Sequence, residues 1–152
     1  MTALVANALE AYQRLEVETG VAAASPQRLV VMLYDGAVKA IHTARAALAR
    51  GDVAGRGAAI SKAIAIIDEG LRPALDLKSG GEIAANLAAL YDYIVNRLLY
   101  ANLKQDQASL EEAGQLLSEL KSAWDTLERK TRAESAAQAS DDGRTALSYG
   151  RV

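Results

Sequence analysis

Apolar residues recur every three or four positions through four successive segments of this chain, and this spacing restricts the fold to packed helices. Residues three or four positions apart share one face of an α-helix, whereas a half-buried strand would alternate apolar and polar residues. No such alternation persists over a useful length. The clearest stripe lies in the fourth segment and consists of Leu110, Ala113, Leu117, Leu120, Trp124 and Leu127. The pattern therefore predicts an all-α protein.

Local signals place the boundaries of four helices. Ser25 and Pro26 are typical of an N-cap followed by the first helical residue, where the missing N–H of proline costs nothing. Pro73 should loosen the end of the second helix, because proline removes a backbone donor and crowds the preceding turn. The expected order is a helix from Pro26 to Gly51, a second from about Val53 to Ala74, a third between turns at 78–81 and 104–107, and a fourth that ends near Arg132.

Similar lengths and short connections favour helices that run antiparallel to their neighbours. We therefore expect an antiparallel up-down four-helix bundle at residues 25–132. Residues 133–152 are small and polar, which predicts a flexible tail. Residues 1–24 are expected to form a short amphipathic segment whose apolar residues are Leu4, Val5, Ala8, Leu9 and Tyr12.

The composition argues against catalysis. The chain has no cysteine and a single histidine, so disulfides, thiolate zinc sites and a cysteine nucleophile are excluded. No nucleophile–base pair and no set of metal ligands can be assembled from the remaining residues. We therefore expect a protein that is not an enzyme and needs no cofactor and no metal. The lack of cysteine suits a reducing compartment, and the N-terminus lacks a signal-peptide pattern, so a cytoplasmic location is expected.

Charge and hydropathy argue against two further classes of partner. A net charge of −2 without a basic face does not favour nucleic acid. The most apolar run, residues 87–103, is interrupted by Asp92, Asn96 and Arg97 and so does not predict a membrane span. An interfacial membrane helix would need a basic face beside the apolar one, and none is visible.

Two of the expected helices carry more apolar residues than one core face uses. In the third helix, Tyr93 and Tyr100 lie on one flank of the core stripe, and Val95 and Leu99 lie on the other. A helix that is apolar over most of its circumference needs a second partner besides its own core. The corresponding surplus residues elsewhere are Val31, Tyr34, Val38 and Ile41 on the first helix and Ile66 on the second.

We expect these surplus residues to form an interaction surface, because contiguous apolar patches on soluble proteins usually mark binding sites. The surface would suit an amphipathic or extended client segment laid along a groove between helices. Leu9 and Tyr12 of the N-terminal segment are expected to cover part of it before the client binds. An alternative reading of the same residues is a structural bundle whose surplus faces form a homo-oligomeric interface, in the simplest case a homodimer.

Three stretches carry a resemblance to a known family. They are ASPQRLVVMLYDGAVKAI at 24–41, GGEIAANLAALYDYIVNRLLYANLKQD at 80–106 and LLSELKSAW at 116–124. In order and spacing they resemble the flagellar secretion chaperone FliS family, over about residues 10 to 130. The chain departs from the family pattern at Gly70 and Pro73, which interrupt a usually smoother second helix, and in its longer tail.

The resemblance implies an all-helical cytoplasmic chaperone that binds the disordered C-terminal segment of flagellin. Such a chaperone prevents premature polymerisation of flagellin and aids its presentation to the flagellar export gate, a type III secretion system. The resemblance also implies that Tyr12 corresponds to the N-terminal tyrosine thought to lie over the client groove in the family.

Overall fold

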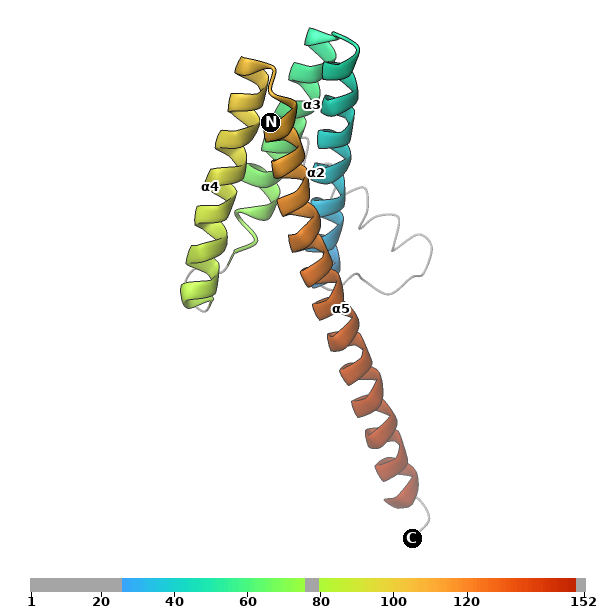
Figure 1. Cartoon of the computed structure of the whole chain (residues 1–152). Helices are drawn as coiled ribbons and strands as arrows, with labels where there is room; N and C mark the ends of the chain where they lie inside the picture. The colour runs from blue at the N-terminus through green and yellow to red at the C-terminus, as the bar shows by residue number, and fades with distance from the viewer. Residues whose placement is uncertain (1–25, 76–79, 150–152) are drawn as a thin grey trace.

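The computed structural model describes residues 26–75 and 80–149, and side chains as far as residue 138. Its elements are four helices arranged as a bundle, and the described ranges contain no strand (Figure 1). The all-α four-helix bundle predicted from the sequence is confirmed. The helices are α2 (Pro26–Ala49), α3 (Val53–Ala65), which continues into the π-helix η1 (Ile66–Leu71), α4 (Gly81–Lys104) and α5 (Gln107–Tyr149).

Neighbouring helices run antiparallel, as polar contacts between them show. Along α2 and α5, Asp35 pairs with Lys121 and Arg45 pairs with Glu111, so rising numbers on one helix meet falling numbers on the other. Both α2 and α4 pack against α3 and against α5. The helices α2 and α4 therefore occupy opposite corners of the bundle.

The helix α2 contributes more buried residues than any other element of the described chain. It packs extensively against both α3 and α5. Alanines on its inner side allow close approach, because they keep neighbouring backbones apart by only one methyl group. The buried residues of α2 are Val31, Tyr34, Ala37, Ala40, Ile41, Ala44 and Ala47. Ile60, Ile67, Leu71, Tyr91, Ile94, Leu98, Leu110 and Leu117 of the other elements complete the core.

Two tyrosines join opposite corners of the bundle. The hydroxyl groups of Tyr34 on α2 and Tyr91 on α4 hydrogen-bond to each other, and their ring centroids lie 6.4 Å apart. The indole N–H of Trp124 on α5 also hydrogen-bonds to Tyr34. Tyr34 and Tyr91 are 0% and 1% exposed, so their hydroxyl groups satisfy each other where water has no access. Burial raises the pKa of both tyrosines, since it disfavours the phenolate.

The end of the second predicted helix is irregular, as Pro73 led us to expect, but the irregularity begins already at Ile66. There α3 becomes the π-helix η1, and the N–H of Arg72 bonds to the carbonyl of Ile67 at 2.8 Å. The wider π turn accommodates an extra residue and keeps Ile67 and Leu71 on the buried side. Residues 72–74 then form a turn.

The fourth helix extends further than the sequence predicted. Instead of losing regular structure near Arg132, α5 continues as a helix to Tyr149 and projects well beyond the bundle (Figure 1). The expected amphipathic segment at 1–24 lies outside the described residues, as does the N-cap Ser25. Within the described ranges, no helix combines the length and apolarity that crossing a bilayer requires.

The buried tyrosine pair predicts a distinctive response to alkaline pH. Because the folded state holds the pKa of Tyr34 above its unfolded value of about 10, this residue contributes full stability below pH 10 and loses it as the pH rises further. Between pH 9 and pH 11 the free energy of unfolding should fall by about 1 kcal/mol more in the wild type than in Tyr34→Phe. Urea unfolding followed by circular dichroism measures this difference.

The exposed residue Tyr100 supplies the matched control for that experiment. Tyr100→Phe removes a hydroxyl of the same kind from the surface, where Tyr100 is 45% exposed. This variant should follow the wild-type pH dependence. Parallel curves for Tyr34→Phe and the wild type would contradict the role given to the buried pair.

Candidate interaction surface

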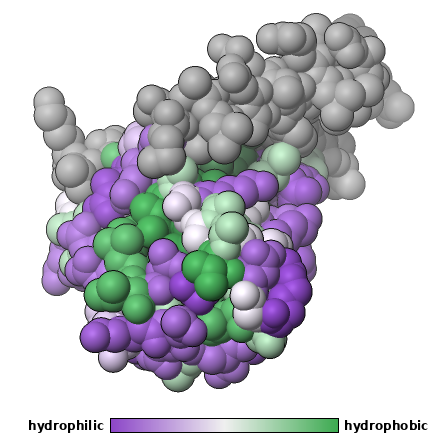
Figure 2. Space-filling model, turned by 90° about the horizontal axis from the view of Figure 1, so that it is seen from above, coloured by the Kyte–Doolittle hydropathy of each residue, from purple (hydrophilic) through white to green (hydrophobic). Residues whose placement is uncertain are grey.

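The outward side of α4 carries large apolar side chains that no neighbouring element covers. Tyr93 is 46% exposed, Leu99 53%, Tyr100 45% and Leu103 77%. We call these four residues the outer patch. Figure 2 views the end of the bundle where α4 finishes and shows apolar residues gathered on the α4 side, divided by hydrophilic residues. Tyr93, Leu99 and Tyr100 were expected to be exposed from the sequence, and the structure places all three at the surface.

Polar contacts fix the position of the outer patch on the bundle. The hydroxyl of Tyr93 donates to Glu112 of α5, and this bond raises the pKa of the tyrosine because a carboxylate disfavours a neighbouring phenolate. The guanidinium of Arg97 lies 5.2 Å from the ring centroid of Tyr100 and donates to Ser109 at 2.6 Å. The two tyrosine rings are therefore held in place on a rigid helix, which is a favourable arrangement for anchoring a partner.

A second apolar region lies between the first half of α4 and α5. Here the core stripes of both helices continue but are incompletely covered, because the two helices diverge toward the start of α4 (Figure 1). Ile83 is 73% exposed and Leu127 is 45% exposed. We call this region the open seam, and it consists of Ile83, Leu87 and Leu90 of α4 with Leu116, Leu120, Trp124 and Leu127 of α5.

The surplus stripe predicted on α2 is not exposed. Val31 is 4% exposed, Tyr34 0% and Ile41 1%, so these residues belong to the core rather than to a free surface. The physical reason is that α2 packs against α3 and α5 at once, which buries side chains beyond a single core face. Ile66 of η1 is also buried, where its side chain faces Gly36 of α2 at contact distance.

Two further predicted residues are neither fully exposed nor fully buried. Val38 of α2 and Val95 of α4 are half-buried and pack against the edge of the core. Leu9 and Tyr12, expected to cover the surface, lie outside the described residues. Of the predicted residues that the structure describes, those that are exposed therefore all lie on α4.

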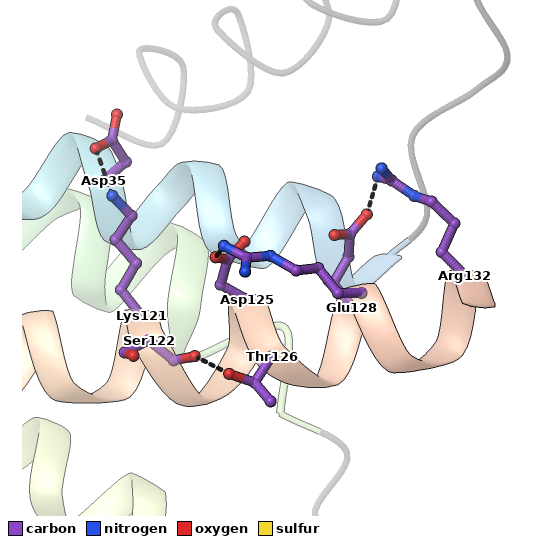
Figure 3. Close-up of polar contacts among 8 residues, drawn as sticks. Asp35, Lys121, Ser122, Asp125, Thr126, Glu128 and Arg132 are labelled. Carbon is purple, nitrogen blue, oxygen red and sulfur yellow. Dashed lines mark hydrogen bonds and ion pairs between the residues drawn. The ribbon is translucent and has the colours of Figure 1, made fainter. Parts of the chain in front are cut away.

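A polar cleft lies between α2 and α5 on another side of the bundle. It has a volume of about 360 Å³ and is lined by both apolar and charged residues. Lys121 reaches from α5 to Asp35 of α2 at 3.0 Å (Figure 3). Lys39 and Lys121 lower the pKa of Asp35, since both hydrogen-bond to its carboxylate. The cleft is lined by Arg28, Val31, Met32, Asp35, Gly36, Lys39, Lys121 and Asp125.

The sequence reasoning missed most of the open seam. Ile83, Leu87 and Leu90 continue the 3–4 spacing of the buried residues Tyr91, Ile94 and Leu98, so periodicity alone groups them with the core. The sequence signals at this end were the glycine-rich turn at 78–81 and the proline at position 73. Among the described residues, no group of acidic or histidine side chains could hold a metal ion.

Comparisons with known proteins place the chain in a family. The family model described as flagellar protein FliS matches residues 8–131. The chain belongs to the FliS family. Flagellar secretion chaperone FliS of Salmonella typhimurium (strain LT2) is 49% identical over 125 residues, covering 82% of this chain and 93% of the relative. The protein of the same name from Escherichia coli K12 is 43% identical over 119 residues, covering 78% and 88%.

A more distant relative shows the same extent of match. Flagellar secretion chaperone FliS of Bacillus subtilis (strain 168) is 33% identical over 120 residues, covering 79% of this chain and 85% of the relative. The resemblance noted from the sequence is thereby confirmed. The matched region includes α2, α3, η1, α4 and the bundled part of α5, while the projecting end of α5 lies beyond it.

The distinction between surface and core residues on α4 predicts opposite effects of substitution. Leu103→Ser should change the free energy of unfolding by less than about 0.5 kcal/mol and should lower the binding of an apolar dye such as bis-ANS, because Leu103 is exposed. Leu98→Ala should cost about 2–5 kcal/mol, because it leaves a cavity in the core. Thermal and urea unfolding measure both values. A large loss of stability in Leu103→Ser would show that the outer patch is packed in solution.

Proposed function

We propose that this FliS-family protein is a cytoplasmic type III export chaperone that binds the disordered C-terminal segment of flagellin. Its action is masking: the segment that drives filament assembly is held on the chaperone, so flagellin stays unpolymerised until export. The chaperone then aids delivery to the flagellar export gate. Family membership supports the class of function, and the names of the relatives support a role in flagellar secretion.

The observation that carries the proposal is the exposure of α4 on two sides. Its outer patch faces away from the bundle, and its part of the open seam extends the core stripe with only partial cover. A disordered segment that folds on binding must offset its ordering entropy, and such coupling typically buries about 1,000–3,000 Å². At about 25 cal/mol per Å², even 500 Å² of apolar burial gives roughly 12 kcal/mol, most of which is offset by ordering and association.

We therefore assign the client-binding surface to α4 and the facing side of α5. Tyr93, Leu99 and Tyr100 are kept from the sequence-based prediction, with Val95 beside them at the edge of the core. Val31, Tyr34, Ile41 and Ile66 are not proposed as client contacts, because they are buried in the bundle. The open seam fits an amphipathic client helix, since it offers a stripe of leucines on each of two helices.

Peptide binding tests the proposal directly. We expect a synthetic peptide of the flagellin C-terminal segment to bind the full chain, and Ile83→Asp, Leu127→Asp and Tyr100→Asp each to weaken binding at least tenfold. These positions are exposed, so a charge there should leave the helical content unchanged while opposing apolar contact. Isothermal titration calorimetry measures affinity and circular dichroism measures helicity.

Ala46→Asp provides the control, because it places the same charge on an exposed position of α2. This variant should bind the peptide as the wild type does. Equal binding by all four variants would contradict the assigned surface. Failure of the wild type to bind the peptide would contradict the proposed client.

The N-terminal segment is proposed to cover part of this surface until the client arrives. Leu9 and Tyr12 supply apolar side chains for such a cover, and the segment leads directly into α2 at Pro26. Deletion of residues 1–20 should raise bis-ANS binding and strengthen peptide binding several-fold, because the client would no longer compete with the segment. Unchanged dye and peptide binding after the deletion would show that the segment is not a cover.

A further inference from the structure

The helix α4 is tied to the bundle over only part of its length. Among the described residues, every side-chain hydrogen bond or ion pair that joins α4 to another element lies at Tyr91 or beyond it. Tyr91 bonds to Tyr34, and the later contacts follow toward the C-terminal end of the helix. They are Asp92 with Arg72, Tyr93 with Glu112, Arg97 with Ser109 and Glu112, and Asn102 with Arg56.

Apolar burial along α4 follows the same division. Tyr91, Ile94, Leu98 and Ala101 are at most 1% exposed, whereas Ala84 is the one buried residue before Tyr91 among the described residues of this helix. The first half of α4 is therefore weakly attached to the bundle, both by polar contacts and by apolar burial. It begins at Gly81, whose φ of 54° lies in the left-handed region that glycine adopts without strain.

The helix opposite the first half of α4 is held firmly. α5 is joined to α2 by the ion pairs of Arg45 with Glu111 and of Lys121 with Asp35. Gly114 of α5 lies so close to α2 that an added Cβ would stand 3.3 Å from a methyl group of Ile41. Of the two helices that border the open seam, the first half of α4 is therefore the less firmly attached to the bundle.

We propose that residues 81–90 of α4 form an arm that moves against α5 about a pivot at Tyr91. In the empty protein the arm closes part of the time, and Leu87 and Leu90 then contact Leu116 and Leu120. An occupant of the open seam holds the arm away from α5. The identity of that occupant as the flagellin segment rests on the proposed function, whereas the movement itself rests on the packing of α4.

The antiparallel register indicates which residues meet when the arm closes. Tyr93 faces Glu112 and Arg97 faces Ser109, so a step back along α4 corresponds to an equal step forward along α5. This register places Leu87 opposite Ser118 and Glu119, so Leu120 is the nearest following apolar residue of α5. The chain contains no cysteine, so a pair of introduced cysteines can form only the intended disulfide within one molecule.

The test uses the full chain with Leu87→Cys and Leu120→Cys, under mild oxidation, with and without the flagellin C-terminal peptide. The control carries Ile41→Cys and Gly114→Cys across the firmly held contact between α2 and α5, away from the proposed client surface. We expect the empty seam pair to cross-link within tenfold of the control rate. Saturating peptide should slow the seam pair at least tenfold and leave the control rate unchanged. The cross-linked seam protein should bind peptide at least tenfold more weakly, with recovery on reduction.

Two results would overturn the arm. One is a seam pair that stays reduced in the empty protein while the control pair oxidises. The other is a cross-linked seam protein that binds peptide as well as the reduced form does. If the wild-type chain binds no peptide, the proposed function fails. The movement of the arm is then tested by hydrogen exchange in the empty protein alone. There, backbone amides of 82–90 should exchange hydrogen at least tenfold faster than those of 92–102, and equal exchange would overturn the arm.

Discussion

The close packing of α2 against both α3 and α5 is the constraint on which the rest of the bundle depends. Small side chains such as Ala37, Ala44 and Ala47 let the neighbouring helices approach until these residues are fully buried. Approach from two sides also covers residues on the flanks of the stripe. Val31, Tyr34 and Ile41 therefore become part of the core, although one buried face alone would have left them exposed.

The helix on the opposite corner, α4, has no comparable environment. It meets α3 and α5 over its second half, where polar contacts and the Tyr34–Tyr91 bond hold it in register. Its first half diverges and leaves leucines of the core stripe partly exposed. The bundle thus combines a firmly packed α2–α3–α5 unit with one helix whose apolar surface exceeds what the monomer can cover.

This division has an energetic cost that fits a binding protein. An exposed leucine or tyrosine contributes little to folding and forgoes stabilisation that burial would supply. Ile83 and Leu103, among the most exposed large apolar residues of the described chain, both lie on α4. A partner that covers such residues gains the apolar burial that the bundle lacks. The polar anchors of α4 keep this surface in place without covering it, which is a form of preorganisation.

The sequence alone determined the helical class, the number of helices in the bundle and the family, because 3–4 spacing and the turn signals are local properties of the chain. It also identified Tyr93, Leu99 and Tyr100 as surface residues, since they fall outside the core arc of α4. Periodicity could not separate Val31 and Tyr34, which are buried in the bundle, from residues of the same type that stay exposed. Nor could it show that Leu87 and Leu90 lack a full partner, or that α5 remains helical beyond Arg132. Those outcomes depend on how closely and at what angle the helices meet, which only the tertiary structure decides.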